Sequence, residues 1–324
     1  MLYKLWFWLE SYCYDALINL NTGLLPEGAD MNLKTYSSME QAAEELFQSK
    51  INTSVSVPGG DINREFRIEL EDRTVFVKTN RRENLSFFEA EAEGLNAIAG
   101  TNTICVPEVF AMGTDSQYGS FLMMEWSEGR REANFFRNFG RKLALMHRAD
   151  TAALVPCARF GFMHDNFIGS TSQSNQPADS WIEFFRDARL ESQFRLADSW
   201  FESQDRKAVT SLLDHLDKYL PEPNFPSLLH GDLWNGNYLT GNDGSAWLID
   251  PAAYVGYFEA DLAMTELFGG FPGDFYAAYD EINPMEPEYE DRRDLYNLYH
   301  LLNHLNLFGG SYLGSVRSLL RRYG

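Results

Sequence analysis

Cysteine and positive charge are scarce in this 324-residue sequence. The three cysteines, Cys13, Cys105 and Cys157, form neither a CxxC pair nor a disulfide framework. This usage is typical of a reducing compartment, so we expect a cytoplasmic location. Lysine and arginine number 27 against 47 aspartates and glutamates, a net charge of −20. Such a charge repels nucleic acid and suits cationic partners, although it can also serve solubility alone.

No uninterrupted apolar run is long enough to cross a membrane. Residues 1–30 come nearest, because apolar side chains recur there at helical spacing, but charged residues interrupt them. The segment also lacks the small-residue cleavage site of a signal peptide. We expect either an amphipathic helix that docks on a partner or membrane surface, or an extension ahead of a native start at Met31 or Met39. Neither an integral membrane span nor a catalytic role is expected for this segment.

The chain after residue 30 has the pattern of a small antiparallel sheet with flanking helices. Met39–Phe47 is a predicted helix with Ser38 as its N-cap. Predicted strands follow on both sides of a turn that contains Gly59 and Gly60, and a further strand ends at Lys78. Glycines allow backbone amides to approach phosphates closely, although most such pairs only form hairpin turns.

Lys78 and Glu91 are predicted to form an ion pair. Apolar positions flank Glu91 in the predicted helix Phe87–Ile98, which turns its carboxylate inward. A half-buried carboxylate needs a cation, and Lys78 is the candidate. A lysine at a strand end is usually only solvated, so the prediction depends on this helix. A lysine held in this way can contact the phosphates of a nucleotide.

A connector between two lobes is predicted where the strand Ser120–Trp126 ends. By analogy, the backbone of Met124, Glu125 and Trp126 is expected to contact a nucleobase, although a plain strand end has the same pattern. The pattern beyond this point is mainly helical. The predicted helices are Phe135–His147, Trp181–Ser199 and Asp205–Tyr219.

The run LLHGDLWNGNYL, which begins at residue 228, carries the clearest chemistry. It predicts a strand end, a polar loop and a hairpin whose return strand ends in Asp250. Asp232 can accept a proton from a substrate hydroxyl, while Asn237 and Asp250 can hold Mg²⁺ beside nucleotide phosphates. His-Gly-Asp and Ile-Asp-Pro are each common in turns, so either alone is ambiguous. Their order, together with the upstream lysine and glutamate, predicts phosphoryl transfer.

Polar residues in the last third of the chain have less certain roles. His300 and His304 share a helix face, but leucine stands where the HExxH zinc motif requires glutamate. They could line a substrate pocket or make buried hydrogen bonds, and we expect the second. Asp261 is expected to hold the loop around Asp232, and residues 251–257 are predicted to be loop.

The motifs together resemble the fructosamine kinase family, also called ketosamine 3-kinases. The segments that carry the resemblance are Pro58–Asn63, Phe76–Lys78, Phe88–Glu91, His230–Asn237, Glu259–Phe271 and Tyr299–Gly310. It covers the chain from about residue 39 to the C-terminus. The late segments are the more discriminating, because the His-Gly-Asp loop is shared with aminoglycoside phosphotransferases and choline kinases.

The resemblance implies an α+β, protein-kinase-like fold of two lobes. These are a small antiparallel-sheet N-lobe for the nucleotide, residues 31–126, and a larger, mainly helical C-lobe, residues 127–324. The implied activity is ATP- and Mg²⁺-dependent phosphorylation of the 3-hydroxyl of ketosamines, free or on glycated proteins, which leads to deglycation. A monomer with no nucleic-acid partner is expected.

Specific roles also follow from the resemblance. It implies that Lys78 contacts the α- and β-phosphates, that Asp232 is the general base, and that Asn237 and Asp250 are the metal ligands. Trp234 would flank the sugar. Some members carry a cysteine in the glycine loop, but none of the three cysteines falls there, so no redox-controlled dimer is expected.

Two alternatives stay open. One is a kinase of the same fold that acts on another small cationic alcohol, such as an aminoglycoside or choline. The other is a catalytically inactive nucleotide-binding module, which the complete set of predicted catalytic residues disfavours.

Overall fold

The computed structural model describes residues 35–58 and 63–324. This part of the chain belongs to one compact unit. None of its helices is both long enough and apolar enough to cross a membrane. The predictions for residues 1–30 and for Gly59 and Gly60 concern positions outside the described residues. The lobe boundary between residues 126 and 127 stays a prediction.

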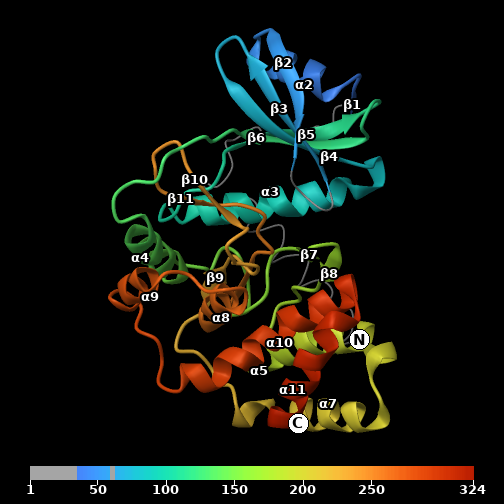
Figure 1. Cartoon of the computed structure of the whole chain (residues 1–324), viewed down its shortest axis with the longest axis vertical. Helices are drawn as coiled ribbons and strands as arrows, with labels where there is room; N and C mark the ends of the chain where they lie inside the picture. The colour runs from blue at the N-terminus through green and yellow to red at the C-terminus, as the bar shows by residue number, and fades with distance from the viewer. Residues whose placement is uncertain (1–34, 59–62) are drawn as a thin grey trace, which may run out of the picture. The chain divides into compact units, whose positions relative to one another are not determined.

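A six-stranded sheet forms the N-terminal part, with the strand order β1-β5-β6-β4-β3-β2 (Figure 1). The β1–β5 pairing is parallel and the other pairings are antiparallel, so the sheet predicted as antiparallel is mixed at one edge. The two residues of β1 are too few to produce an alternation signal in the sequence. The strands are β1 (Thr35–Tyr36), β2 (Ile51–Val57), β3 (Arg64–Leu70), β4 (Thr74–Asn80), β5 (Val109–Asp115) and β6 (Ser120–Glu125).

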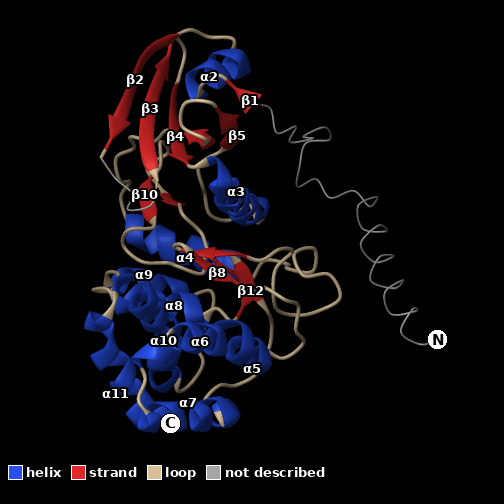
Figure 2. Ribbon diagram, turned by 90° about the vertical axis from the view of Figure 1, so that its right-hand side faces the viewer, coloured by secondary structure: helices blue, strands red, loops and turns tan. Residues whose placement is uncertain are grey.

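Two helices cover the two faces of this sheet. Helix α2 (Met39–Phe47) begins at the predicted N-cap Ser38, whose hydroxyl accepts a hydrogen bond from the Gln41 amide at 3.2 Å. Met39 of α2 packs with the residues of β3, β4 and β6 that face it. After the short 3₁₀ turn η1 (Arg82–Asn84), helix α3 (Leu85–Gly100) packs on the opposite face, as Figure 2 shows.

The chain from residue 135 onward is mainly helical and contains the largest hydrophobic core. Three short antiparallel pairs lie within it, β7–β8, β9–β12 and β10–β11. The pair β10–β11 is the hairpin that the sequence predicts before Asp250. The strands are β7 (Asn166–Ile168), β8 (Thr171–Gln173), β9 (Ser227–Leu229), β10 (Tyr238–Thr240), β11 (Ala246–Leu248) and β12 (Tyr254–Gly256).

Helix α10 contacts α8, α11 and α6, α4 packs against α9, and α7 packs against α11. The α-helices are α4 (Phe135–His147), α5 (Trp181–Phe184), α6 (Ser192–Leu196), α7 (Ser203–Asp214), α8 (Glu259–Leu267), α9 (Gly273–Asp280), α10 (Tyr289–Phe308) and α11 (Leu313–Tyr323). The other helical turns are η2 (Phe185–Glu191), η3 (Asp198–Trp200), η4 (Leu216–Lys218) and η5 (Gly310–Tyr312).

Three predictions of secondary structure were wrong. The helix predicted over Asp205–Tyr219 ends at Asp214 as α7, and the 3₁₀ turn η4 follows it. The segment 251–257, predicted as loop, contains β12, whose three residues are too few to show a period and are all buried against β9. The single helix predicted over Trp181–Ser199 is divided by a π-helical turn. That turn contains the fully buried Arg189, which donates hydrogen bonds to Ser174 O at 2.5 Å and Asn175 Oδ1 at 2.7 Å. These tertiary bonds leave no local signal in the sequence.

Candidate active site

Strand alternation decides which face of the sheet Lys78 occupies. Val75 and Val77 of β4 pack on the α2 side, so Phe76 and Lys78 point toward α3. Phe88 of α3 is buried on this side of the sheet. Glu91 lies three residues further along the same helix face. The two elements therefore bring an ammonium and a carboxylate together in a region with little water.

Lys78 bridges two carboxylates. Its Nζ lies 2.7 Å from Glu91 Oε1, the pairing predicted from the helix register, and it also bonds to Asp250 Oδ1. Burial opposes the ammonium charge, but Asp250 and Glu91 outweigh it and hold the pKa of Lys78 above its ordinary value. Burial likewise opposes the charge of Asp250, yet Lys78 holds the pKa of this carboxyl below its ordinary value. Lys78 thus joins the sheet to the hairpin of the helical part.

The HGD loop, residues 230–237, follows β9. Gly231 has φ +82° and a Cβ there would lie 2.1 Å from Ala252 O, so only glycine fits this position. His230 accepts a hydrogen bond at Nδ1 from the Asp232 amide at 3.3 Å, and its Nε2 donates to Ile249 O at 2.8 Å. These contacts fix the loop against the residue that precedes Asp250. Asp250 itself has φ +54°, which is uncommon for a residue other than glycine and typical of functional sites.

Asp261 of α8 holds the HGD loop from below, as the sequence predicts. Its carboxylate accepts hydrogen bonds from the amides of His230 at 2.7 Å and Gly231 at 2.9 Å. His147 Nε2 lies 3.2 Å from the same carboxylate, while its Nδ1 lies 2.7 Å from the hydroxyl of Tyr279. Burial acts to raise the pKa of Asp261, but these partners outweigh it and keep the pKa below its ordinary value. The loop therefore rests on a buried anion.

Asp232 has the pKa and the solvent access that a general base requires. Burial, with smaller contributions from Asp250 and Asp261, raises the pKa of Asp232 to about 7, although a hydrogen bond from Asn237 opposes the shift. Its side chain remains 21% exposed, so a substrate can reach it. A carboxyl with a pKa near neutrality is well matched to proton transfer at physiological pH.

Asn237 and Asp250 offer oxygen atoms of the kind that Mg²⁺ prefers. Asn237 Nδ2 donates to the Asp232 backbone oxygen at 2.7 Å and to Asp232 Oδ2 at 3.1 Å, which leaves Asn237 Oδ1 as its acceptor for a cation. The Asp250 side chain is 44% exposed. Across residues 35–58 and 63–324, no cluster of three or more His, Cys, Asp or Glu side chains could hold a metal. Mg²⁺ usually combines one or two protein oxygens with phosphates and water.

The two histidines of α10 differ in their surroundings. His304 Nδ1 bonds to the His300 backbone oxygen at 2.8 Å, which agrees with the expected structural role. His300 is 4% exposed, yet its Nδ1 is buried without a hydrogen-bond partner and lies 3.9 Å from Asp232 Oδ1. Only His300 therefore approaches the predicted base.

Trp234 lies on the exposed side of the HGD loop. The residue is 38% exposed, and its ring covers Gly236, where a Cβ would lie 2.4 Å from the indole. Phe268 contacts it edge-on at a centroid distance of 6.1 Å. An exposed aromatic face beside Asp232 is suited to the apolar face of a sugar.

The connector after β6 is already partly hydrogen-bonded. The Glu125 amide donates to Glu108 O at 2.9 Å, and Trp126 O accepts from Asn242 Nδ2 at 3.1 Å. Met124 is buried on the α3 side of the sheet. The bond from Asn242 also links the connector to the turn between β10 and β11, a contact that the sequence did not reveal.

Two residues that support the segment after Asp250 were missed. Asn166 Nδ2 donates to Ala253 O at 2.7 Å, and Gln173 Nε2 donates to Ala252 O at 3.0 Å. Both belong to the β7–β8 hairpin, whose strands have three residues each. Strands this short give no periodic signal in the sequence.

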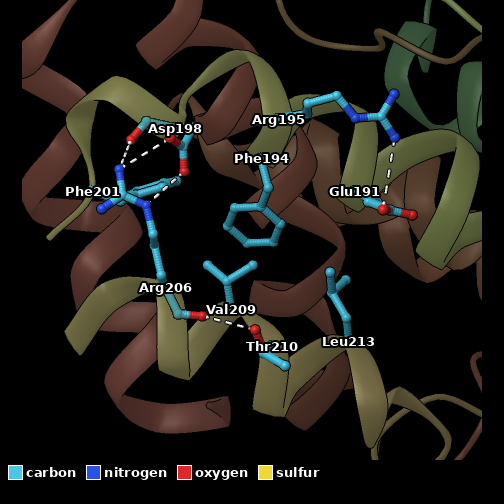
Figure 3. A pocket seen from close by; sticks show the side chains of 9 residues that line it. All are labelled: Glu191, Phe194, Arg195, Asp198, Phe201, Arg206, Val209, Thr210 and Leu213. Atoms are coloured by element: carbon cyan, nitrogen blue, oxygen red, sulfur yellow. Dashed lines mark hydrogen bonds and ion pairs between the residues drawn. The ribbon is translucent and has the colours of Figure 1, made fainter. Parts of the chain in front are cut away.

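A cavity of about 290 Å³ lies apart from these residues (Figure 3). An ion pair between Arg206 and Asp198 and a looser one between Arg195 and Glu191 lie at its margin. None of the predicted site residues lines it, so it does not bear on the predicted chemistry. Its lining residues are Glu191, Phe194, Arg195, Asp198, Phe201, Arg206, Val209, Thr210 and Leu213.

Comparison with known families agrees with this geometry. The sequence profile of the family described as fructosamine kinase matches residues 34–323. The chain belongs to the fructosamine kinase family. A relative named "Probable ketoamine kinase" from Synechocystis is 41% identical over 275 residues, which cover 84% of this chain and 90% of the relative. The chloroplastic protein-ribulosamine 3-kinase of Oryza sativa subsp. indica is 40% identical over 280 residues, 85% of this chain and 80% of the relative.

Solved structures place this member of the fructosamine kinase family in the predicted fold class. The crystal structure named "Putative fructosamine-3-kinase" from Haemophilus somnus has a TM-score of 0.76 at 32% identity, and covers 88% of this chain and 96% of that one. An aminoglycoside phosphotransferase has a TM-score of 0.56 at 18% identity, over 87% of this chain and 98% of that one. The second likeness shows the kinase-like fold alone.

Proposed function

We propose that this protein is an ATP-dependent ketosamine 3-kinase, which transfers the γ-phosphoryl group of ATP to the 3-hydroxyl of a sugar joined to an amine. Membership of the fructosamine kinase family supports the substrate class. The observation that carries the proposal is the joining of Lys78, Glu91 and Asp250 in one ion cluster, with Asp232 and Asn237 bonded to each other on the adjacent loop. A fold neighbour, an aminoglycoside phosphotransferase, is known in complex with ADP.

Each residue has one task in the transfer. Lys78 releases Asp250 when a nucleotide enters and pairs with phosphate oxygens, while Glu91 keeps its ammonium in place. Asp232 accepts the proton of the 3-hydroxyl as that oxygen bonds to phosphorus and ADP leaves. Most of the catalysis comes from positioning and charge, because phosphoryl transfer needs little covalent chemistry from the protein.

Asn237 and Asp250 would hold Mg²⁺ together with the nucleotide phosphates. The metal would supply positive charge that neutralises the phosphate oxygens. Asp250 is free to take this part once Lys78 has moved to the phosphates.

The product explains how an amine is released. A 3-phosphate stands next to the C2 ketone, and enolisation toward the amine-bearing C1 expels phosphate from C3. The resulting imine hydrolyses and frees the amine. On this basis we propose glycated lysines, free or within proteins, as substrates. The net charge of −20 suits such cationic molecules.

A substrate panel tests the proposal. Purified protein with ATP and Mg²⁺ is offered fructose-lysine, ribulose-lysine and erythrulose-lysine, with kanamycin and choline as acceptors for the alternative kinases. ADP formation with at least one ketosamine, and none above background with kanamycin or choline, is expected. The opposite preference would replace the proposal with one of the alternative kinases, and no ADP formation with any acceptor would favour an inactive binding module.

A further inference from the structure

His300 has a buried polar atom that the transfer described above does not use. Its side chain belongs to α10, a helix separate from the HGD loop, and is 5% exposed. Nδ1 has no hydrogen-bond partner within the described part of the chain. Buried polar atoms are almost always paired, so an unpaired one beside a predicted base calls for a ligand.

The distance from Nδ1 to Asp232 Oδ1 determines what this ligand can be. At 3.9 Å the two atoms are too far apart for a direct hydrogen bond. They are close enough to bind two oxygens on neighbouring carbons of one substrate, one oxygen each. Two such vicinal oxygens lie about one hydrogen-bond length apart, so one can bond to Nδ1 and the other to Oδ1 at the same time without strain.

His300 acts here as a neutral donor. Burial and the neighbouring His304 lower the pKa of His300 to about 3, so the ring is uncharged at neutral pH. A neutral imidazole carries one proton, on either nitrogen. The carboxylate of Asp232 faces Nδ1 and attracts an N–H there, whereas a bare nitrogen lone pair would be repelled. We therefore place the proton on Nδ1.

We infer that His300 is a specificity-determining residue whose Nδ1–H binds the C2 oxygen of the ketosamine while Asp232 holds the neighbouring 3-hydroxyl. A ketone oxygen can only accept hydrogen bonds, and Nδ1 of His300 offers a donor 3.9 Å from Asp232 Oδ1. This inference rests on the proposed function. It adds that the site recognises the oxygen next to the reacting hydroxyl, a feature that isolated alcohols such as choline lack.

Two acceptors and three variants test this assignment. The acceptors are fructose-lysine and its analogue without the C2 oxygen, which keeps the 3-hydroxyl. The variants are His300→Ala, His300→Asn, whose amide nitrogen can replace Nδ1, and the control Asn303→Ala. Asn303 is a buried polar residue of the same helix, but it bonds to Gln193 and lies outside the predicted site.

His300→Ala is expected to lower kcat/KM for fructose-lysine about 10- to 100-fold, and to change kcat/KM for the C2-deoxy analogue less than about threefold. His300→Asn is expected to recover most of the loss, and Asn303→Ala to change both acceptors by the same factor. If His300→Ala lowers kcat/KM equally for both acceptors, or lowers it for neither, the assignment is wrong.

An NMR measurement on the wild-type protein avoids any problem of variant folding. With ¹⁵N-labelled histidine, fructose-lysine should shift the Nδ1 resonance of His300, and the C2-deoxy analogue should leave it unchanged. Equal shifts from both compounds would overturn the assignment. If wild-type protein phosphorylates fructose-lysine but fructose-lysine and the C2-deoxy analogue give the same effects, the proposed function is retained and only the role of His300 is wrong. If it phosphorylates no ketosamine, both fall.

Discussion

Replacement of Asp261 by asparagine should loosen the HGD loop without changing its sequence. The carboxylate accepts two buried backbone hydrogen bonds, from His230 at 2.7 Å and Gly231 at 2.9 Å, and a third contact from His147. Asparagine has the same size but one acceptor oxygen, and its NH₂ group faces a donor. One charge-assisted bond is therefore lost, and one buried N–H is left unpaired.

The cost follows from these two effects. A hydrogen bond to a charged group contributes about 1.5–3 kcal/mol, and an unpaired buried donor costs a similar amount. Allowing for partial relaxation, we expect the free energy of unfolding to fall by about 3 kcal/mol. For a domain of this size that corresponds to a decrease in Tm of roughly 5 °C. Because Asp232 moves with the loop, kcat/KM should fall at least about tenfold as well.

Calorimetry and initial-rate kinetics at pH 7.5, well below Tm, measure the two effects. Glu259→Gln is the matched control. Glu259 is a fully buried carboxylate of the same helix, but it bonds to Arg292 at 2.5 and 2.8 Å rather than to the HGD loop. The Glu259→Gln substitution should lower the free energy of unfolding by a similar amount and leave kcat/KM within about twofold of the wild-type value. An Asp261→Asn protein with wild-type Tm and turnover, or an equal kinetic loss in Glu259→Gln, would refute the reasoning.

Four further predictions concern the site itself. Because burial raises the pKa of Asp232 to about 7, kcat/KM should rise with pH and level off above about 7, and a profile already flat from pH 5 would contradict this. The same raised pKa means that ionisation of Asp232 destabilises the fold as the pH rises toward 7. Asp232→Asn should therefore abolish most turnover but raise the free energy of unfolding at pH 8 by at most about 4 kcal/mol. Denaturant titration would detect this gain. Lys78→Met leaves two carboxylates without their cation, so the free energy of unfolding should fall by about 3–5 kcal/mol. ATP binding, measured by calorimetry, should also weaken, and an unchanged ATP affinity would count against a role of Lys78 at the phosphates. Trp234→Ala should raise KM for the sugar at constant Tm, because the residue is 38% exposed, and an unchanged KM would remove Trp234 from the acceptor site.

The sequence predicted the elements whose signals are local. Ser38 precedes a helical pattern and forms the cap, and helix α4 has the predicted bounds Phe135–His147. The apolar positions around Glu91 allowed its orientation toward Lys78 to be predicted, because helix periodicity is a strong signal over four turns. The family and the kinase-like fold also followed from the motifs and are confirmed.

What the sequence could not reveal depends on long-range contacts. His147 bonds to Asp261 and Tyr279 more than a hundred residues away, and no periodicity predicts such a pairing. Three-residue strands such as β12 have no measurable alternation. The contrast between His300 and His304 was equally hidden, because the two share a helix face and differ only in which turn of α10 lies beside Asp232. The catalytic roles of the site residues stay predictions.

The position of the transferred phosphate tests the central claim most directly. Wild-type protein, ATP and Mg²⁺ are incubated with ribulose-lysine or fructose-lysine, and the products are followed by ³¹P NMR and by assay of free lysine. We predict a phosphate ester at C3 that decays spontaneously to inorganic phosphate, with release of one lysine for each phosphate lost. A stable ester at another hydroxyl, with the lysine still attached, would contradict the account.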